Sequence, residues 1–129
     1  MLIMASLVCF TSCSKDDDED GFDYPMETLI GTWEGTDVYI DGKWYDITGY
    51  WYSDLQFSIT FYDGGKYYGK GYFGTGSGTY TAKGKTIKTY VNGKPYYVYE
   101  VISLDNKKAH LYMGVEGSNE KIQIKVVKK

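Results

Sequence analysis

Side chains able to carry acid–base or nucleophilic chemistry are scarce in this sequence. His110 is the single histidine, so a Ser-His-Asp triad would have to use it, and no nucleophile-elbow motif surrounds a serine. His110 also takes the outward position of an alternating stretch, which is typical of an exposed residue. A carboxylate pair such as Glu34 and Glu100 would suit a glycosidase only at a defined separation. We therefore expect no enzymatic activity.

Three short patterns fit ligand-binding motifs, but their surroundings argue against each of them. Residues 16–27 have the spacing of an EF-hand calcium loop, yet they lie in an acidic run without the flanking helices that converge such ligands. The three glycines of 69–74 match a dinucleotide fingerprint, yet no helix follows to hold a pyrophosphate. Residues 84–86 resemble the end of a P-loop, but Thr79 stands where that motif needs glycine. We expect no metal ion and no cofactor.

Aromatic residues are unusually frequent. The chain has 15 Tyr, 3 Trp and 5 Phe, which together make up 18% of its residues. Neighbours in a strand face opposite ways, so Tyr67-Tyr68 and Tyr96-Tyr97 are each expected to place one ring on either face. Some rings must then lie outside the core or in a wet lumen, unless tyrosine serves only as a good strand former on the surface.

Alternation of apolar and polar residues dominates the chain from residue 29 onward. In 55–62, for example, Leu55, Phe57, Ile59 and Phe61 alternate with Gln, Ser, Thr and Tyr, which predicts a half-buried strand. Only a single helical turn is expected, near 26–30. Gly-rich and Asx-Gly turns separate nine expected strands: 30–40, 43–51, 55–62, 66–73, 78–82, 86–91, 96–104, 109–116 and 120–128.

This pattern predicts an all-β fold of eight or nine antiparallel strands. An up-and-down barrel closes such a meander without exposed edges, and a two-sheet β-sandwich is the alternative.

The first residues are typical of an export signal. Residues 1–12 are apolar and then small, too short to span a bilayer, and fit a secretory signal peptide. Phe10-Thr11-Ser12-Cys13 resembles a bacterial lipobox, in which Cys13 is acylated and becomes the mature N-terminus. The acidic residues that follow repel one another and stay solvated, so residues 13–28 are expected to form a lipidated Cys and an acidic tether. The barrel domain is expected to follow at 29–129.

The charge balance and the cysteines restrict the partners. The sequence has 14 lysines, no arginine and 17 acidic residues, which argues against a nucleic-acid partner. Cys9 would leave with the signal and Cys13 would carry lipid, so the folded part has no thiol for a disulfide, a metal site or a nucleophile.

The order of several motifs resembles a known family. Leu29-Ile30-Gly31-Thr32-Trp33 opens the first expected strand with the Gly-x-Trp of the lipocalin signature, and short matching stretches follow within 61–64, 78–80, 84–87 and 99–104. Together they resemble the lipocalin-like domains of Bacteroidota lipoproteins over nearly all of 29–128. In lipocalins an Arg of the last strand packs on the signature Trp, and the resemblance implies Lys125 or Lys128 in that place.

The leading functional expectation is a non-catalytic outer-membrane lipoprotein, displayed on the cell surface, whose barrel binds a small, partly apolar ligand. The wall of 55–61 would surround the ligand, Trp33 would close the base and Tyr hydroxyls would orient the ligand. The alternatives are recognition of carbohydrate or glycoprotein through exposed Trp and Tyr, a protein-interaction or inhibitor module, and a barrel filled by its own side chains. The candidate contact residues are Trp33, Phe57, Phe61, Trp44, Trp51, Tyr68 and Tyr72.

Overall fold

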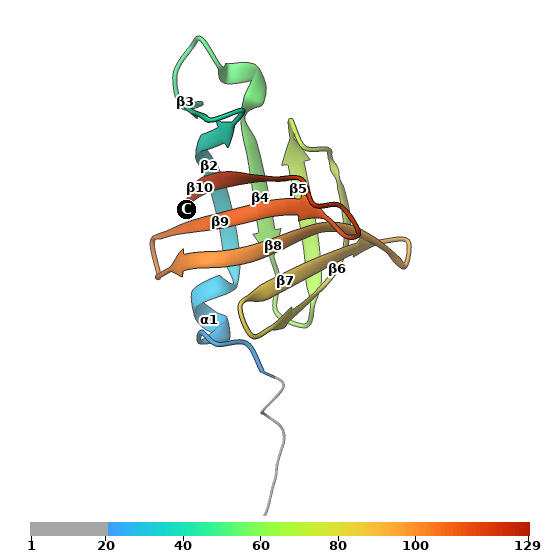
Figure 1. Ribbon diagram of the computed structural model, residues 1–129. Helices are drawn as coiled ribbons and strands as arrows, with labels where there is room; N and C mark the ends of the chain where they lie inside the picture. Colours follow the sequence, from blue (N-terminus) through green and yellow to red (C-terminus); the bar gives the residue numbers. More distant parts are fainter. Residues whose placement is uncertain (1–20) are drawn as a thin grey trace, which may run out of the picture.

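The structure is a computed structural model that describes residues 21–129. It contains the helical turn α1 (Met26–Leu29), the 3-10 turn η2 (Ser53–Leu55) and a sheet of nine strands (Figure 1). The strands are β2 (Gly31–Ile40), β3 (Lys43–Asp46), β4 (Phe57–Phe61), β5 (Lys66–Gly71), β6 (Gly76–Lys83), β7 (Thr86–Val91), β8 (Lys94–Leu104), β9 (Lys108–Val115) and β10 (Lys121–Lys128).

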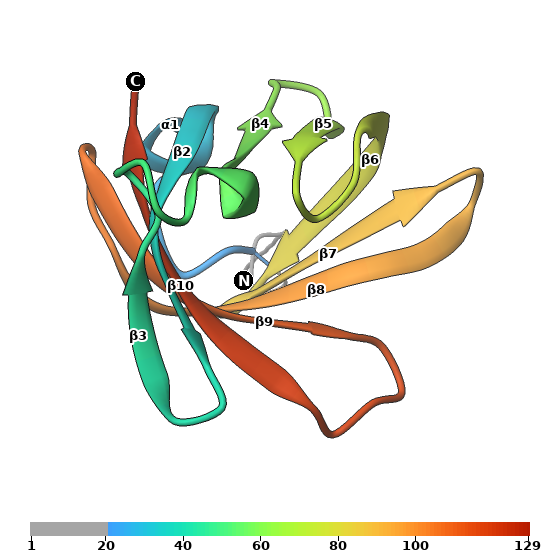
Figure 2. The same cartoon turned by 90° about the horizontal axis from the view of Figure 1, so that it is seen from above.

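Eight of the strands close into a ring. From β4 to β10 each strand pairs antiparallel with the next along the chain, and β2 pairs with both β4 and β10 (Figure 2). The closing ladder joins β10 to β2 from Gln123↔Tyr39 to Lys128↔Trp33. The predicted antiparallel barrel is therefore confirmed, and the sandwich alternative is excluded because one sheet closes on itself.

The ninth strand, β3, lies in line with β4. Residues 31–34 of β2 pair with β4, whereas residues 37–40 pair with β3 along the same edge. The two strands thus form one interrupted strand of the wall. Residues 47–56 leave the wall between them and project from the top of the barrel in Figure 1.

The strand expected over 43–51 is wrong beyond Asp46. The Asp46 carboxylate accepts hydrogen bonds from the backbone N–H and the hydroxyl of Thr48, at 2.8 and 2.6 Å, and this local turn replaces the ladder. The same two bonds lower the pKa of Asp46 below its usual value. Ile47 then turns inward and is fully buried, and Leu55 belongs to η2 instead of to the next strand.

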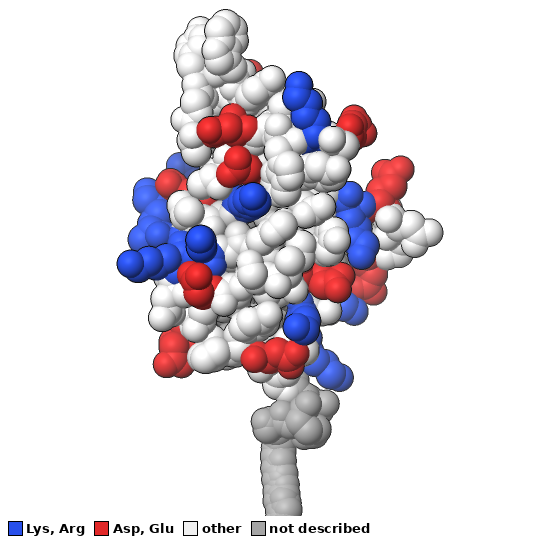
Figure 3. Space-filling view, turned by 60° about the vertical axis from the view of Figure 1, so that its left-hand side comes forward, with Lys and Arg blue, Asp and Glu red and all other residues white. Residues whose placement is uncertain are grey.

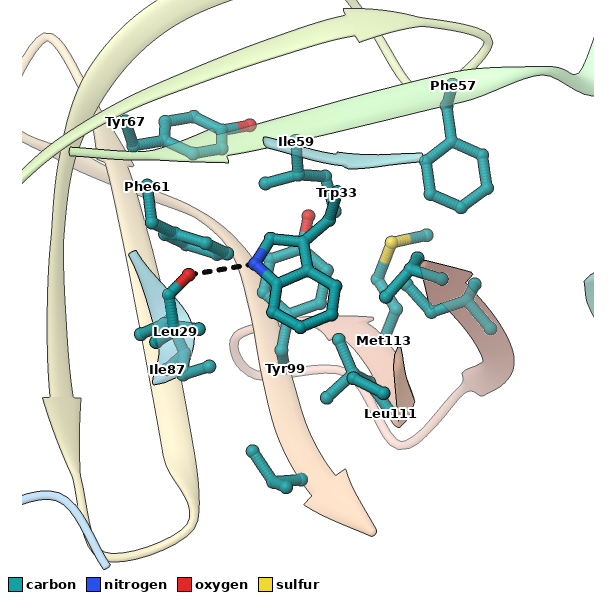
Figure 4. Packing of buried hydrophobic residues seen from close by; sticks show 14 of the residues in the cluster. Leu29, Trp33, Phe57, Ile59, Phe61, Tyr67, Ile87, Tyr99, Leu111 and Met113 are labelled. Carbon is teal, nitrogen blue, oxygen red and sulfur yellow. Dashed lines mark hydrogen bonds between the residues drawn. The ribbon is translucent and has the colours of Figure 1, made fainter. Parts of the chain in front are cut away.

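The barrel interior is filled by the side chains that alternate inward along the strands. Phe57, Ile59 and Phe61 are all buried, as the period of two predicts. Trp33 is 2% exposed and lies among Leu29, Ile59, Phe61 and Tyr99 in Figure 4. The wall of 57–61 is therefore part of a packed core.

α1 and the residues before it close the base of the barrel. The Trp33 indole N–H donates to the Leu29 carbonyl oxygen at 2.8 Å, which ties the first ring strand to α1. Upstream, Phe22 forms a parallel bridge with Gly84, and its ring packs against the core. The structured part of the chain therefore begins ahead of residue 29, inside the segment expected to be a tether.

Of the two candidate lysines of the last strand, Lys128 lies over Trp33, whereas Lys125 lies over Trp44. The Lys128 ammonium lies 5.2 Å from the centre of the Trp33 ring and donates to the Glu27 carbonyl oxygen at 3.2 Å. Gly31 makes room for this arrangement, because a Cβ there would lie 3.2 Å from the Lys128 stem and its φ is +139°. The Gly-x-Trp motif thus has a local steric reason.

Residues 21–129 contain the complete ring, its closing ladder and the buried core. We therefore expect this part of the chain to fold by itself, with one cooperative thermal transition by circular dichroism.

Candidate ligand-binding site

A hollow of about 690 Å³ lies at the end of the barrel opposite α1. The β2–β3 hairpin, the 72–75 loop and the β9–β10 hairpin surround it, and Figure 2 shows the two hairpins extending to the same side of the ring. Its apolar lining consists of Ile40, Phe73, Tyr97, Met113, Val115 and Ile122. Its polar rim includes Asp41, Ser118, Asn119, Glu120 and Lys121. An apolar floor with a polar rim suits a small ligand that is only partly apolar.

The lumen below this hollow has almost no free space. One void of about 10 Å³ lies near the base among Trp33, Phe61 and their neighbours. Another of about 10 Å³ lies higher, where Tyr67, Tyr97 and Tyr99 meet. A ligand larger than a water molecule therefore has room at the mouth but none at the base.

Phe73 lies next to both the hollow and the upper void, and so does Tyr97, since each of them lines both spaces. The Phe73 ring lies 4.9 Å from that of Phe57 and 6.1 Å from that of Tyr97. The loop that carries Phe73 turns at Gly71 and Gly74, whose φ angles of +105° and +109° favour glycine. Phe73 is thus an aromatic side chain on a short loop beside both spaces.

A β-bulge places Tyr96 and Tyr97 together at the mouth. Thr89 of β7 stands opposite both of them, since the pairing shifts between Lys88↔Val98 and Tyr90↔Pro95. Their rings lie 4.5 Å apart and both pack against the core. The expectation of one ring on each face is wrong here, because a bulge re-aims the side chains. For Tyr67 and Tyr68 the expectation holds: the first is 4% exposed inside, and the second is on the outer face.

Burial keeps the interior tyrosines protonated. Desolvation raises the pKa of Tyr67 to about 12, and the nearby Tyr96 and Tyr97 add to that shift. Desolvation also raises the pKa of Tyr99 well above its usual value, with smaller contributions from Tyr67, Tyr97 and Tyr96. Each hydroxyl therefore remains a hydrogen-bond donor at neutral pH.

The structure brings few of the sequence-predicted site residues together. Phe57 lies below the hollow against Phe73, while Trp33 and Phe61 lie deep in the packed core. Tyr72 is 54% exposed next to Phe73, with a ring distance of 5.0 Å. Trp44, Trp51 and Tyr68 all lie outside the lumen. Sequence reasoning missed Ile40, Phe73, Tyr97, Met113 and Ile122 as a group; the glycines that flank Phe73 were the available signal.

Trp44 belongs to a cluster on the outer face. The Lys125 ammonium lies 4.5 Å from its ring centre, and the rings of Tyr39 and His110 lie 5.1 and 5.6 Å away. His110 in turn shares a 2.7 Å hydrogen bond with Gln123. These contacts cover part of Trp44, which remains 37% exposed and is far less open than Tyr50 or Trp51.

The most exposed aromatic rings lie on the 47–56 excursion. Tyr50 and Trp51 are 85% and 87% exposed, and their ring centres lie 5.8 Å apart. In Figure 3 this projecting top of the molecule is nearly uncharged, whereas Lys and acidic residues intermix over the barrel below. The excursion is therefore a second candidate contact surface.

Comparisons with protein-family models, curated proteins and solved structures gave no match to this chain. Within 21–129, no group of three or more His, Cys, Asp or Glu side chains is placed to hold a metal ion. The same residues include no helix long and apolar enough to cross a membrane. Cys13 and most of the EF-hand-like segment lie outside the described residues.

Proposed function

We propose that this protein is a non-catalytic binding protein that holds a small, partly apolar ligand at the open end of its barrel. The hollow of about 690 Å³ carries the proposal, because its apolar floor lies above a lumen that is otherwise full. Binding would bury the apolar part of the ligand against Phe73, Met113 and Ile122, and this burial contributes about 25 cal/mol for each Å² removed from water.

The proposed setting is the outer membrane, with Cys13 as the lipid anchor and the barrel on the cell surface. The signal-like residues 1–12 and the acidic run after Cys13 support this setting, as does the resemblance to lipocalin-like domains of Bacteroidota lipoproteins. The Lys128–Trp33 contact supports the resemblance, because it supplies the cation on the signature Trp. The α1 end of the barrel would then face the membrane, and the mouth would be free to meet ligand.

Titration with a neutral fluorescent apolar probe, N-phenylnaphthylamine, tests the proposal on residues 21–129. We expect saturable enhancement of probe fluorescence. Ile122→Lys should weaken binding at least about tenfold, because it places an ammonium in the apolar floor.

Val127→Lys is the matched control, since it adds the same charge on the exposed outer face of the same strand. Equal probe binding by the two variants would place the probe elsewhere and overturn the proposal.

Recognition of glycans by the 47–56 excursion is the second candidate. The exposure of Tyr50 and Trp51 favours it, because open aromatic faces with polar edges suit sugar rings as well as protein partners.

The double variant Tyr50→Ser/Trp51→Ser separates this candidate from the first. We expect it to change the free energy of unfolding by less than about 0.5 kcal/mol, because neither ring packs into the core. The affinity of the double variant for the oligosaccharides of a test panel that bind the native chain should be at least about tenfold lower, while its affinity for N-phenylnaphthylamine stays unchanged. Tyr72→Ser, also exposed but off the excursion, is the control. Unaltered glycan binding by the double variant would exclude the excursion.

A further inference from the structure

The void beneath Phe73 has an unusual polar lining. Tyr67 is 4% and Tyr99 is 2% exposed, yet among residues 21–129 no hydrogen-bond partner lies within reach of either hydroxyl. By contrast, Tyr80 and Tyr96 donate to the carbonyl oxygens of Tyr62 and Phe73, each at 2.9 Å. Buried polar groups are normally paired, so two unpaired hydroxyls at one void indicate an absent acceptor.

The dimensions of the void limit what that acceptor can be. Its volume of about 10 Å³ is enough for about one oxygen atom, the size of a single water molecule. Gly69 keeps the space open beside Tyr67, because a Cβ at Gly69 would lie 2.8 Å from the Tyr67 hydroxyl oxygen. The hollow on the other side of Phe73 is large enough for the rest of a small molecule.

The charge of the interior limits the ligand further. The buried polar residues of 21–129 are Thr28 and Thr89, and the one lysine among the residues that line the void, Lys70, is itself exposed to water. An anion placed there would lose its hydration without gaining a buried charged partner, because Lys70 is solvated. Both tyrosines stay protonated at neutral pH, so each hydroxyl has a proton to donate to an acceptor.

From these contacts we infer that the hydroxyls of Tyr67 and Tyr99 form a subsite for an uncharged carbonyl or ether oxygen at the buried end of the ligand. The inference rests on the proposed function and specifies its ligand class: a neutral molecule with an apolar body and a terminal acceptor. The oxygen enters the void as Phe73 moves aside, while the body stays in the hollow against Met113 and Ile122.

Three probes of similar shape test the subsite by displacement of N-phenylnaphthylamine from residues 21–129. Acetophenone carries a terminal carbonyl, ethylbenzene lacks an acceptor, and benzoate carries a charge. We expect acetophenone to bind about tenfold more tightly than ethylbenzene, although it is the less hydrophobic of the two, and benzoate to bind weakest.

Removal of the hydroxyls should abolish that preference. In Tyr67→Phe/Tyr99→Phe the affinity for acetophenone should fall to that for ethylbenzene, whose own affinity stays unchanged. The double variant should unfold at the same temperature as the native chain or higher, because the lost hydroxyls had no partner. Tyr112→Phe is the control, since its ring lies outside the lumen beneath the Lys121 ammonium.

The outcomes separate the two levels of the proposal. Equal affinity of the native chain for acetophenone and ethylbenzene, or a preference that survives in the double variant, overturns the subsite and leaves binding at the mouth intact. Tighter binding of benzoate overturns the neutral ligand class. Failure of N-phenylnaphthylamine and all three probes to bind overturns the proposed function together with the subsite.

Discussion

At the scale of single residues, Lys128 links three parts of the base of the barrel. Its stem crosses Gly31, its ammonium lies over the Trp33 ring, and the same ammonium donates to the carbonyl oxygen of Glu27 in α1. A lysine thus combines packing, a cation–π contact and a helix-end hydrogen bond in one side chain.

Lys128→Met separates these contributions, because methionine retains the apolar stem but lacks the charge and the donor. We expect the free energy of unfolding to fall by about 1 kcal/mol, measured by urea denaturation. Lys128→Arg should retain most of the stability, since guanidinium also stacks on an indole. A methionine variant as stable as the native chain would show that only the stem matters.

At the scale of elements, the β7–β8 bulge decides what the mouth contains. The Thr89 hydroxyl donates to the Tyr97 carbonyl oxygen at 2.8 Å, and Thr89 is fully buried. This bond stabilises the bulge that directs Tyr96 and Tyr97 to the same region.

Thr89→Val keeps the shape of the side chain but leaves the Tyr97 carbonyl oxygen without this donor. We expect a loss of about 1–2 kcal/mol in unfolding free energy. Binding of N-phenylnaphthylamine should also weaken, because Tyr97 lines the hollow. Thr81→Val in the neighbouring strand β6 is the control, since Thr81 is exposed and should change neither quantity. Loss of stability with unchanged probe binding would separate the bulge from the site.

The same element marks the boundary of what the sequence could predict. Period-two alternation and turn residues predicted the strands and the barrel, because inward burial and turn conformation are local properties. The bulge was not predictable, since it depends on how two strands pair. Two adjacent tyrosines, Tyr96 and Tyr97, give no sign in the sequence of which face each ring takes. The site was missed for a related reason: Ile40, Phe73 and Met113 meet only when the ring closes.

At the scale of the whole molecule, the buried tyrosines predict loss of stability in alkali. The pKa of Tyr67 is about 12 in the folded chain against an ordinary 10.0, and burial also raises the pKa of Tyr99 well above 10.0. Between these pH values the unfolded chain has released protons that the folded chain still holds, so stability falls as pH rises.

We therefore expect full stability below pH 10 and cooperative unfolding as pH increases toward 12. Phenolate absorbance should show the buried tyrosines ionising together with the loss of circular dichroism. Tyr67→Phe/Tyr99→Phe should move the alkaline midpoint upward, whereas Tyr112→Phe should not. A native midpoint unaffected by the double variant would contradict this account.

The ladder between β2 and β10 also has a consequence for the timing of folding. During synthesis the strands from β4 onward can pair one after another, and β2 can pair with β4. The other edge of β2 stays unpaired until β10 has been made. Contacts between segments so distant in the chain form slowly, because a long loop must close first. The ring therefore stays open until residues 121–128 have been made. That interval is the period of greatest risk of aggregation, because unpaired strand edges stay exposed.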